Sequence, residues 1–187
     1  MRRRSLLGAA CAVPFAVPSV FAQSWPTKSI RYVVPFAPGG TTDILGRLIG
    51  IPLGAALGQS IVVDNRAGAG GVLGADLVAK SAGDGYTLLG STISTQAINP
   101  ALNPKIPYDA AKDFAPVTMI GSTSNVVVVP ARSPFRTIGE LIDHARRNPG
   151  RLSFSSAGTG TSQHMGGELL KQMARTCLLY TSPSPRD

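Results

Sequence analysis

The sequence of 187 residues predicts an α/β fold with a parallel sheet, and three strand–turn units along its first half carry this prediction. Each unit begins with an apolar run of little alternation, which is typical of a strand buried on both faces. Each run then breaks into a turn rich in Gly, Ser or Thr. Successive units of this kind form parallel sheets with right-handed connections. The three runs are Ile30–Phe36, Ile61–Asp64 and Tyr86–Gly90.

The first unit is the most distinctive, and it reads VVPFAPGGTTD over Val33–Asp43. Pro38 has a fixed φ and no N–H group, whereas Gly39 and Gly40 allow another molecule to approach the backbone closely. A helix then begins, and its first amide groups and positive dipole end favour a bound anion. A plain turn between strand and helix explains the same residues, so both interpretations stay open at this point. The residues that could cap the helix are Thr41, Thr42 and Asp43.

Apolar spacing predicts that this helix covers Thr42–Leu57 and ends at Gly58, with a kink or a restart at Pro52. The second turn, Asn65–Gly71, leads into a helix around Val72–Ser81. In parallel sheets, ligands bind outside the carboxyl ends of the strands. The three turns should all lie at that end, which favours a binding site there.

The Gly-rich turns do not match a nucleotide-binding fingerprint. Gly68 and Gly70 would need a third glycine where Leu73 stands, and the sequence has no Gly-Lys-Ser/Thr run. It also has no Cys/His metal spacing and no His-Glu-x-x-His motif. We therefore predict neither a cofactor nor a metal ion.

The second half repeats the opening pattern after an irregular, Pro- and Asn-rich connection over Asn99–Asp113. Strands are predicted at Val117–Ile120 and Asn125–Val129, and a capping box at Thr137–Glu140 opens a helix. A short strand, Leu152–Ser155, then leads into a loop rich in Gly and hydroxyl groups. The helix that follows carries a histidine, which could contact a ligand or be a packed or capping residue. The loop is Ser156–Ser162 and the histidine is His164.

The two ends are set apart by composition. Residues 1–22 have three arginines, an apolar stretch and a small-residue cleavage site, so they are predicted to be an export signal of the Sec or twin-arginine type. A lipoprotein signal at Cys11 is disfavoured because Gly8 stands where Leu is expected. Residues 177–187 (CLLYTSPSPRD) resemble translated sequencing adapter and are predicted to be a non-native tail. An ordinary Ser/Pro-rich tail is the alternative.

Charge and side-chain chemistry exclude several functions. Without the two ends, 14 basic and nine acidic residues remain, scattered along the chain and with few aromatics among them. This pattern argues against nucleic-acid binding and suits an anionic small molecule. Ser162 and His164 could be a hydrolytic pair, but residues two apart at a helix start point in different directions, and no acid is at hand to orient the histidine. We predict no catalytic residues.

Seven segments in order resemble one known family. They are WPTKSIR, VVPFAPGGTTD, VVDNRAGAGG, DGYTLLG, AINPALNPKIPYD, KDFAPVTMIG and SSAGTGTSQHMGGELLK, and they span about residues 24–175. Together they resemble the Bug receptors, the TctC-like solute-binding proteins of tripartite tricarboxylate transporters.

The resemblance implies a periplasmic-binding-protein-like fold of the Venus-flytrap, type II-like kind, with two α/β domains that close on a ligand. Domain one would cover 23–124, and domain two would begin at 125–176 and be incomplete, because complete members are nearly twice as long. Pro52 and Gly54 depart from the helix-favouring residues that are usual in the first helix.

The resemblance also implies the function. A periplasmic receptor would capture a small carboxylate (a di- or tricarboxylate, an acidic amino acid or an aromatic acid) and pass it to membrane permease subunits. The full-length protein would be a monomer. A receptor that docks on a signalling partner is the alternative. The implied ligand-binding residues are Phe36, Gly39, Gly40, Thr42, Asp43, Ser91, Thr92, Ser156, Gly158, Thr161 and His164.

Overall fold

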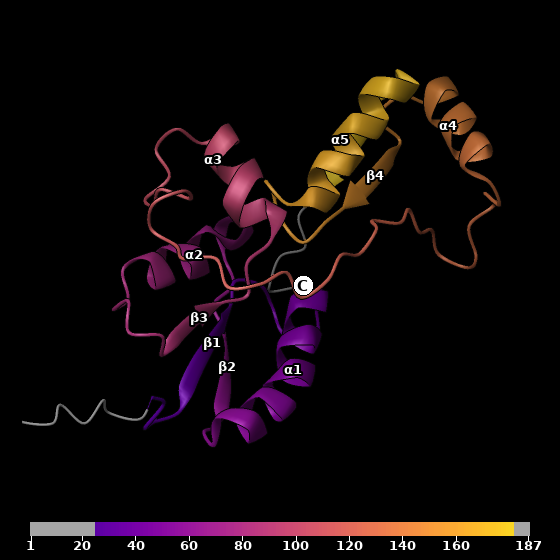
Figure 1. Cartoon of the computed structure of the whole chain (residues 1–187). Helices are drawn as coiled ribbons and strands as arrows, with labels where there is room; N and C mark the ends of the chain where they lie inside the picture. The colour runs from indigo at the N-terminus through magenta and orange to yellow at the C-terminus, as the bar shows by residue number, and fades with distance from the viewer. Residues whose placement is uncertain (1–24, 182–187) are drawn as a thin grey trace, which may run out of the picture.

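The structure is a computed structural model that describes residues 25–181, so the predicted export signal lies outside the described residues. The described chain forms two structural units, and the first of them is built on a parallel sheet with strand order β2-β1-β3. Its strands are β1 (Ile30–Val34), β2 (Ile61–Asn65) and β3 (Thr87–Leu89). Figure 1 shows α1 (Thr41–Leu57) and α2 (Val72–Ala79) on opposite sides of this sheet. The predicted order of strands and helices from Ile30 to Leu89 is confirmed.

The core of the first unit is centred on β1, which pairs with β2 on one side and with β3 on the other. Ile30 lies opposite Ile61, and Val33 lies opposite Leu89. The side chains of Ile30, Val33 and Val34 are fully buried. A central strand buried on both faces explains why β1 shows an apolar run without alternation.

Helix α1 ends at Gly58 as predicted, and the amide of Gly58, at φ 68°, donates to the carbonyl of Gly54. The helix continues through Pro52, so of the expected kink or restart the restart is wrong, and the kink stays a prediction. Pro52 is exposed, whereas Gly50 and Gly54 lie against Ile61 of β2. Packing of this face on the sheet holds the helix together although proline removes one backbone hydrogen bond.

Short helical turns occupy the carboxyl ends of the strands. They are η1 (Ala69–Gly71), the π-helical turn η2 (Ser94–Ile98) and α3 (Asn99–Leu102). The irregular connection predicted from Asn99 therefore begins as a helix. Further along the same connection, the buried Tyr108 hydroxyl donates to the carbonyl of Thr95 at 2.6 Å, which ties the connection back to η2.

The second unit comprises α4 (Ile138–Arg147), β4 (Leu152–Ser155), α5 (Ser162–Ala174) and β5 (Leu178–Thr181). The Thr137 hydroxyl accepts from the Glu140 amide at 3.2 Å, which confirms the predicted start of α4. Strands β4 and β5 pair in parallel. We did not predict β5, which lies within residues 177–187. The origin of those residues stays a prediction.

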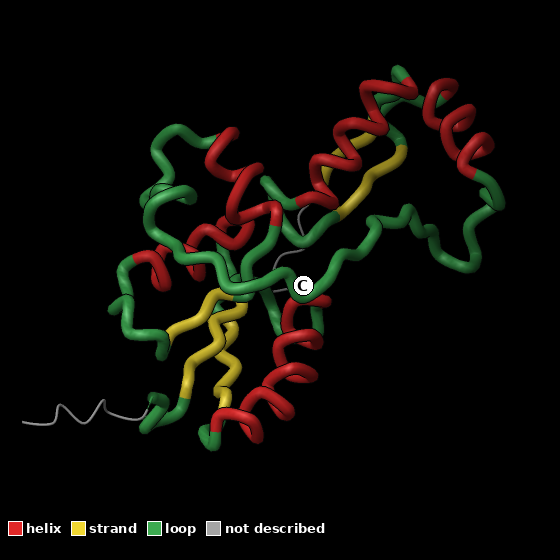
Figure 2. Tube along the Cα trace, in the orientation of Figure 1, coloured by secondary structure: helices red, strands yellow, loops and turns green. Residues whose placement is uncertain are grey.

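The predicted strands at Val117–Ile120 and Asn125–Val129 are wrong. Figure 2 shows a long loop between the two units, and it contains no strand and no helix from Asn103 to Thr137. Val126 and Val128 have exposed fractions of 77% and 81%. Sequence composition favoured strands, but a strand forms only beside a partner, and among residues 25–181 none lies alongside. None of the helices in this range has the length and apolar character needed to cross a membrane.

Candidate functional site

The loop between β1 and α1 is held in shape by Asp43, whose side chain is only 4% exposed. One carboxylate oxygen accepts from the Gly39 amide at 2.9 Å, and the other accepts from the Asn65 side-chain amide at 3.0 Å. The Arg47 guanidinium lies 2.9 Å from the same carboxylate. Asn65 also donates to the carbonyl of Phe36 at 3.2 Å. The carboxylate therefore joins the loop, the helix and the end of β2.

Hydrogen bonds from Arg47 are the largest cause that lowers the pKa of Asp43, from 3.8 to about 2, and the Gly39 amide lowers it further. Burial acts in the opposite direction. Asp43 is therefore a carboxylate at any physiological pH.

The amino-terminal end of α1 carries no side-chain cap. The N-cap residue is Gly40, and Ile44 donates the first helical bond to its carbonyl at 3.0 Å. Capping by Thr41, Thr42 or Asp43, which the sequence allowed, is thus wrong, because Asp43 reaches back past the N-cap to Gly39. Within residues 25–181, the amides of Gly40 and of the first three helical residues have no hydrogen-bond partner. Four amides at a helix start are a strong site for an anion.

The hydroxyl-rich loop after β3 lies beside this helix start. A Cβ atom at Gly90 would stand 2.9 Å from the methyl carbon of Thr42, so the two loops are in contact. The Thr92 amide donates to the Thr95 hydroxyl at 3.1 Å, and this hydroxyl donates to the Thr92 carbonyl at 3.0 Å. The Thr92 hydroxyl is buried and has no partner among the described residues. Ser91 is exposed.

Phe36 packs on the same end of the sheet. Its ring lies 3.2 Å from the position that a Cβ atom would take at Gly71, and the Thr95 methyl group lies 2.9 Å from that position. The three turns predicted to meet at the carboxyl ends of the strands therefore do meet.

The loop between β4 and α5 is held in shape by hydrogen bonds of its own hydroxyl groups. The buried Thr161 hydroxyl donates to the Gly158 carbonyl at 2.7 Å and accepts from the His164 amide at 3.3 Å, which makes Thr161 the N-cap of α5. The Ser156 hydroxyl accepts from the Gly158 amide at 3.2 Å.

His164 is partly buried against two aromatic rings, Phe154 and Tyr180. Its Nε2 lies 3.9 Å from the Glu168 carboxylate, and its Nδ1 is buried without a partner among the described residues. Within residues 25–181, no hydrogen bond joins the His164 ring to Ser162. The Ser162 amide instead donates to the Ser94 hydroxyl at 3.2 Å. The geometry gives no support to a hydrolytic pair.

The two units contact each other where the start of α5 and the loop before it meet η1, η2 and α3 (Figure 1). Sequence reasoning did not select the residues that make this contact. The sequence predicts the turn containing Gly70 at the carboxyl ends of the strands, and Asn99 lies in the AINPALNP segment. Neither pattern indicates which residue of the second unit is the contact. The residues are Gly70, Ser94, Asn99, Thr159, Gly160 and Ser162.

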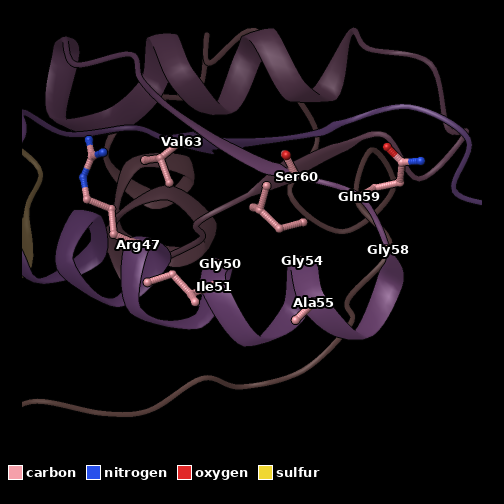
Figure 3. A pocket seen from close by; sticks show the side chains of 10 residues that line it. Arg47, Gly50, Ile51, Gly54, Ala55, Gly58, Gln59, Ser60 and Val63 are labelled. Atoms are coloured by element: carbon pink, nitrogen blue, oxygen red, sulfur yellow. The ribbon is translucent and has the colours of Figure 1, made fainter.

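A groove of about 680 Å³ lies elsewhere, between the carboxyl-terminal half of α1 and β2. Figure 3 shows the side chains of Ile51, Ala55 and Val63 in its wall, with Arg47 at one end and Gln59 at the other. The end at Gln59 lies at the amino end of β2, away from the loops described above, and Arg47 connects the groove with Asp43. No group of three or more His, Cys, Asp or Glu residues in the part of the chain described could hold a metal ion.

The fold and the loops at the strand ends define a class: an α/β protein of the periplasmic-binding-protein kind. The family model of the Tripartite tricarboxylate transporter family receptor (TctC) matches residues 46–182. The chain belongs to this family, which confirms the resemblance seen in the sequence.

Relatives and solved structures agree with this assignment. The UPF0065 protein encoded between tcbD and tcbE in Pseudomonas sp. (strain P51) is 44% identical over 96% of this chain and 53% of its own length. Rpa4515 of R. palustris, solved with adipate, has a TM-score of 0.82 and 38% identity, covering 85% of this chain and 53% of its own. MatC (Rpa3494) of Rhodopseudomonas palustris, solved with bound malate, has a TM-score of 0.80 and 32% identity over 86% and 54%. The chain spans about half the length of these proteins.

Proposed function

We propose that this chain is part of a periplasmic receptor that captures a small dicarboxylate and delivers it to the permease subunits of a tripartite transporter. The observation that carries the proposal is the start of α1, where four amides without partners lie at the same end of the sheet as the partnerless Thr92 hydroxyl. Backbone amides and a neutral hydroxyl are donors suited to a carboxylate. The adipate and malate bound to two similar proteins support the same ligand class.

In this proposal the ligand carboxylate lies against Gly40 and Thr42, with Thr92 as an additional donor and Phe36 as an apolar wall. Asp43 holds the loop and does not itself receive the anion, because two carboxylates would repel each other. The resemblance implies Gly39 as a ligand-binding residue, but its amide donates to the Asp43 carboxylate. Binding requires no chemical step, so the receptor has no catalytic residues.

Isothermal titration calorimetry of the full-length protein tests the proposal. The panel contains adipate, malate and glutamate, with glucose as a neutral control. We expect saturable binding of at least one carboxylate and none of glucose. Binding of glucose without any carboxylate would overturn the anion-binding role. Restored carboxylate uptake by a receptor-deletion strain separates delivery to a permease from a purely sensory role.

A further inference from the structure

Protein groups of the two units contact each other directly. The Ser94 hydroxyl in the first unit accepts from the Ser162 amide in the second, across 68 residues of sequence. Ser94 is buried, with an exposed fraction of 3%. The Ser162 amide is the first of α5. A donor that could have bound an anion is therefore already bonded to Ser94 of the first unit.

Asn99 forms the second part of the contact. It is buried, and its side-chain amide donates to the Gly70 carbonyl at 2.9 Å, which orients its carbonyl oxygen toward Gly160. A Cβ atom at Gly160 would overlap that oxygen, and one at Gly70 would overlap the Thr159 carbonyl. Both glycines have positive φ, 65° at Gly70 and 81° at Gly160. A side chain at Gly70 would meet the backbone of the second unit, and one at Gly160 would have to displace the side-chain oxygen of Asn99.

We propose that Asn99, with Ser94, Gly70 and Gly160, forms a latch that holds the two units together without help from the ligand. The inference rests on the proposed function and deepens it: the α1 side supplies the donors for the carboxylate, and the latch sets how long the ligand stays. Asn99 acts as a positioning residue, because it fixes the Gly70 turn against which the second unit closes.

A contact that joins the two units stabilises the closed arrangement and shifts the balance between open and closed forms toward closure. Ligand enters and leaves through the open form, so a weaker latch raises the dissociation rate. The association rate stays the same where the ligand-free protein is mostly open and rises where the latch holds it closed. A loss of general stability alone would change neither rate of the folded protein.

Two pairs of glycine variants isolate the latch. Gly160→Ala is compared with Gly150→Ala, and Gly70→Ala with Gly58→Ala. Each pair has similar positive φ values, 81° and 71° in the first and 65° and 68° in the second, so the backbone strain is matched. A Cβ atom meets nothing within 4 Å at Gly150 or Gly58, so only the first member of each pair disturbs the contact.

Ser94→Ala is a milder variant that removes one hydrogen bond, and Ser94→Thr retains the hydroxyl. The variants are made in the full-length protein. Stopped-flow displacement of adipate or malate gives the dissociation rate, and small-angle X-ray scattering gives the radius of gyration without ligand. We expect dissociation about threefold to tenfold faster for Ser94→Ala and faster still for Gly160→Ala, with association unchanged or faster. The ligand-free radius should increase for Gly160→Ala, but not for Gly150→Ala.

Equal dissociation rates and equal radii for Gly160→Ala and Gly150→Ala, together with a silent Ser94→Ala, would overturn the latch. The radius is measured without ligand, so it tests the latch even if neither dicarboxylate binds. The unmodified protein could bind neither dicarboxylate while its radius of gyration still depends on Gly160. That result would count against the proposed ligand and in favour of the latch.

Discussion

The protein contains the same local motif twice, a strand that leads through a small-residue loop into a helix, and the two copies use their amide groups differently. In the β1–α1 copy, Asp43 reaches back to the loop and leaves the first amides of the helix without partners in the described range. In the β4–α5 copy, Thr161 caps the helix and Ser94 takes the amide of Ser162. The helix amides of the first copy therefore have no protein partner in the described range, whereas the first amide of the second copy is bonded to Ser94.

The two copies differ because the polar side chain at the helix start stands at a different position in each. A hydroxyl at the N-cap, as in Thr161, satisfies the helix amides locally. An acid three residues into the helix, as in Asp43, instead bonds to the residue before the N-cap. A sequence that reads Gly-Gly-Thr-Thr-Asp and one that reads Gly-Thr-Gly-Thr-Ser look alike in composition, but they place the capping oxygen differently.

The largest effect is expected from Asp43→Ala. It removes the acceptor for Gly39 and Asn65 and leaves the Arg47 charge without its partner, so the loop loses its shape. We expect carboxylate binding to weaken by about 100-fold, measured by calorimetry. Asp43→Asn keeps an acceptor for Gly39 and should fall between this variant and the unmodified protein. Unchanged affinity in both would show that the loop shape does not matter for binding.

Thr92→Val should weaken carboxylate binding by about tenfold, because it replaces the partnerless hydroxyl with a methyl group of similar size. The free energy of unfolding should stay the same or rise, since a buried hydroxyl without a partner is unfavourable. Calorimetry and urea unfolding measure the two quantities. Thr92→Ser, which keeps the hydroxyl, is the control and should retain carboxylate affinity. A loss of stability without a loss of affinity would assign Thr92 to the fold alone.

Thr161→Ala tests the second copy. Removal of this N-cap should reduce the free energy of unfolding by about 1 kcal/mol, measured by urea unfolding. Carboxylate affinity should fall by no more than about threefold, because the donors for the anion belong to the first copy. Thr161→Ser, which keeps the hydroxyl, should restore stability. An affinity loss as large as that of Thr92→Val would place the anion between both helix starts and contradict the division of roles.

The smallest effect is that of pH. The pKa of Asp43 is lowered in the folded protein, so its contribution to stability is complete above its ordinary value of 3.8 and is lost as pH falls toward about 2. The unfolding temperature should therefore be insensitive to Asp43 above pH 4 and decrease between pH 4 and pH 2. Asp43→Asn should flatten that part of the curve. The same slope in both proteins would assign the acid sensitivity to other carboxylates.

Much of the fold could be predicted from local patterns. The apolar runs identify β1, β2 and β3, Gly58 ends α1, and Thr137 begins α4, because each signal acts within a few residues. The carboxyl ends of parallel strands meet at one edge, so the three turns could also be placed together. Contacts that depend on distant partners could not be predicted.

The bond from Ser162 to Ser94 needs both units in place, and nothing in either segment specifies the other. The role of Asp43 was equally hidden, because sequence alone could not say whether it faces the helix, the loop or the ligand. The strands expected at Val117–Ile120 and Asn125–Val129 failed for a related reason. Residue composition indicates that a segment suits a sheet, but not that a neighbouring strand is present.

The exposed valine segment has a consequence for handling the protein. No charged residue occurs between Asp113 and Arg132, and Val126–Val129 combines high β propensity with open backbone groups. Short uncharged segments of this kind pair with copies of themselves and form cross-β aggregates. The 187-residue chain, produced alone and concentrated, should accumulate in inclusion bodies. A lysine in place of Val127 should raise the yield of soluble chain.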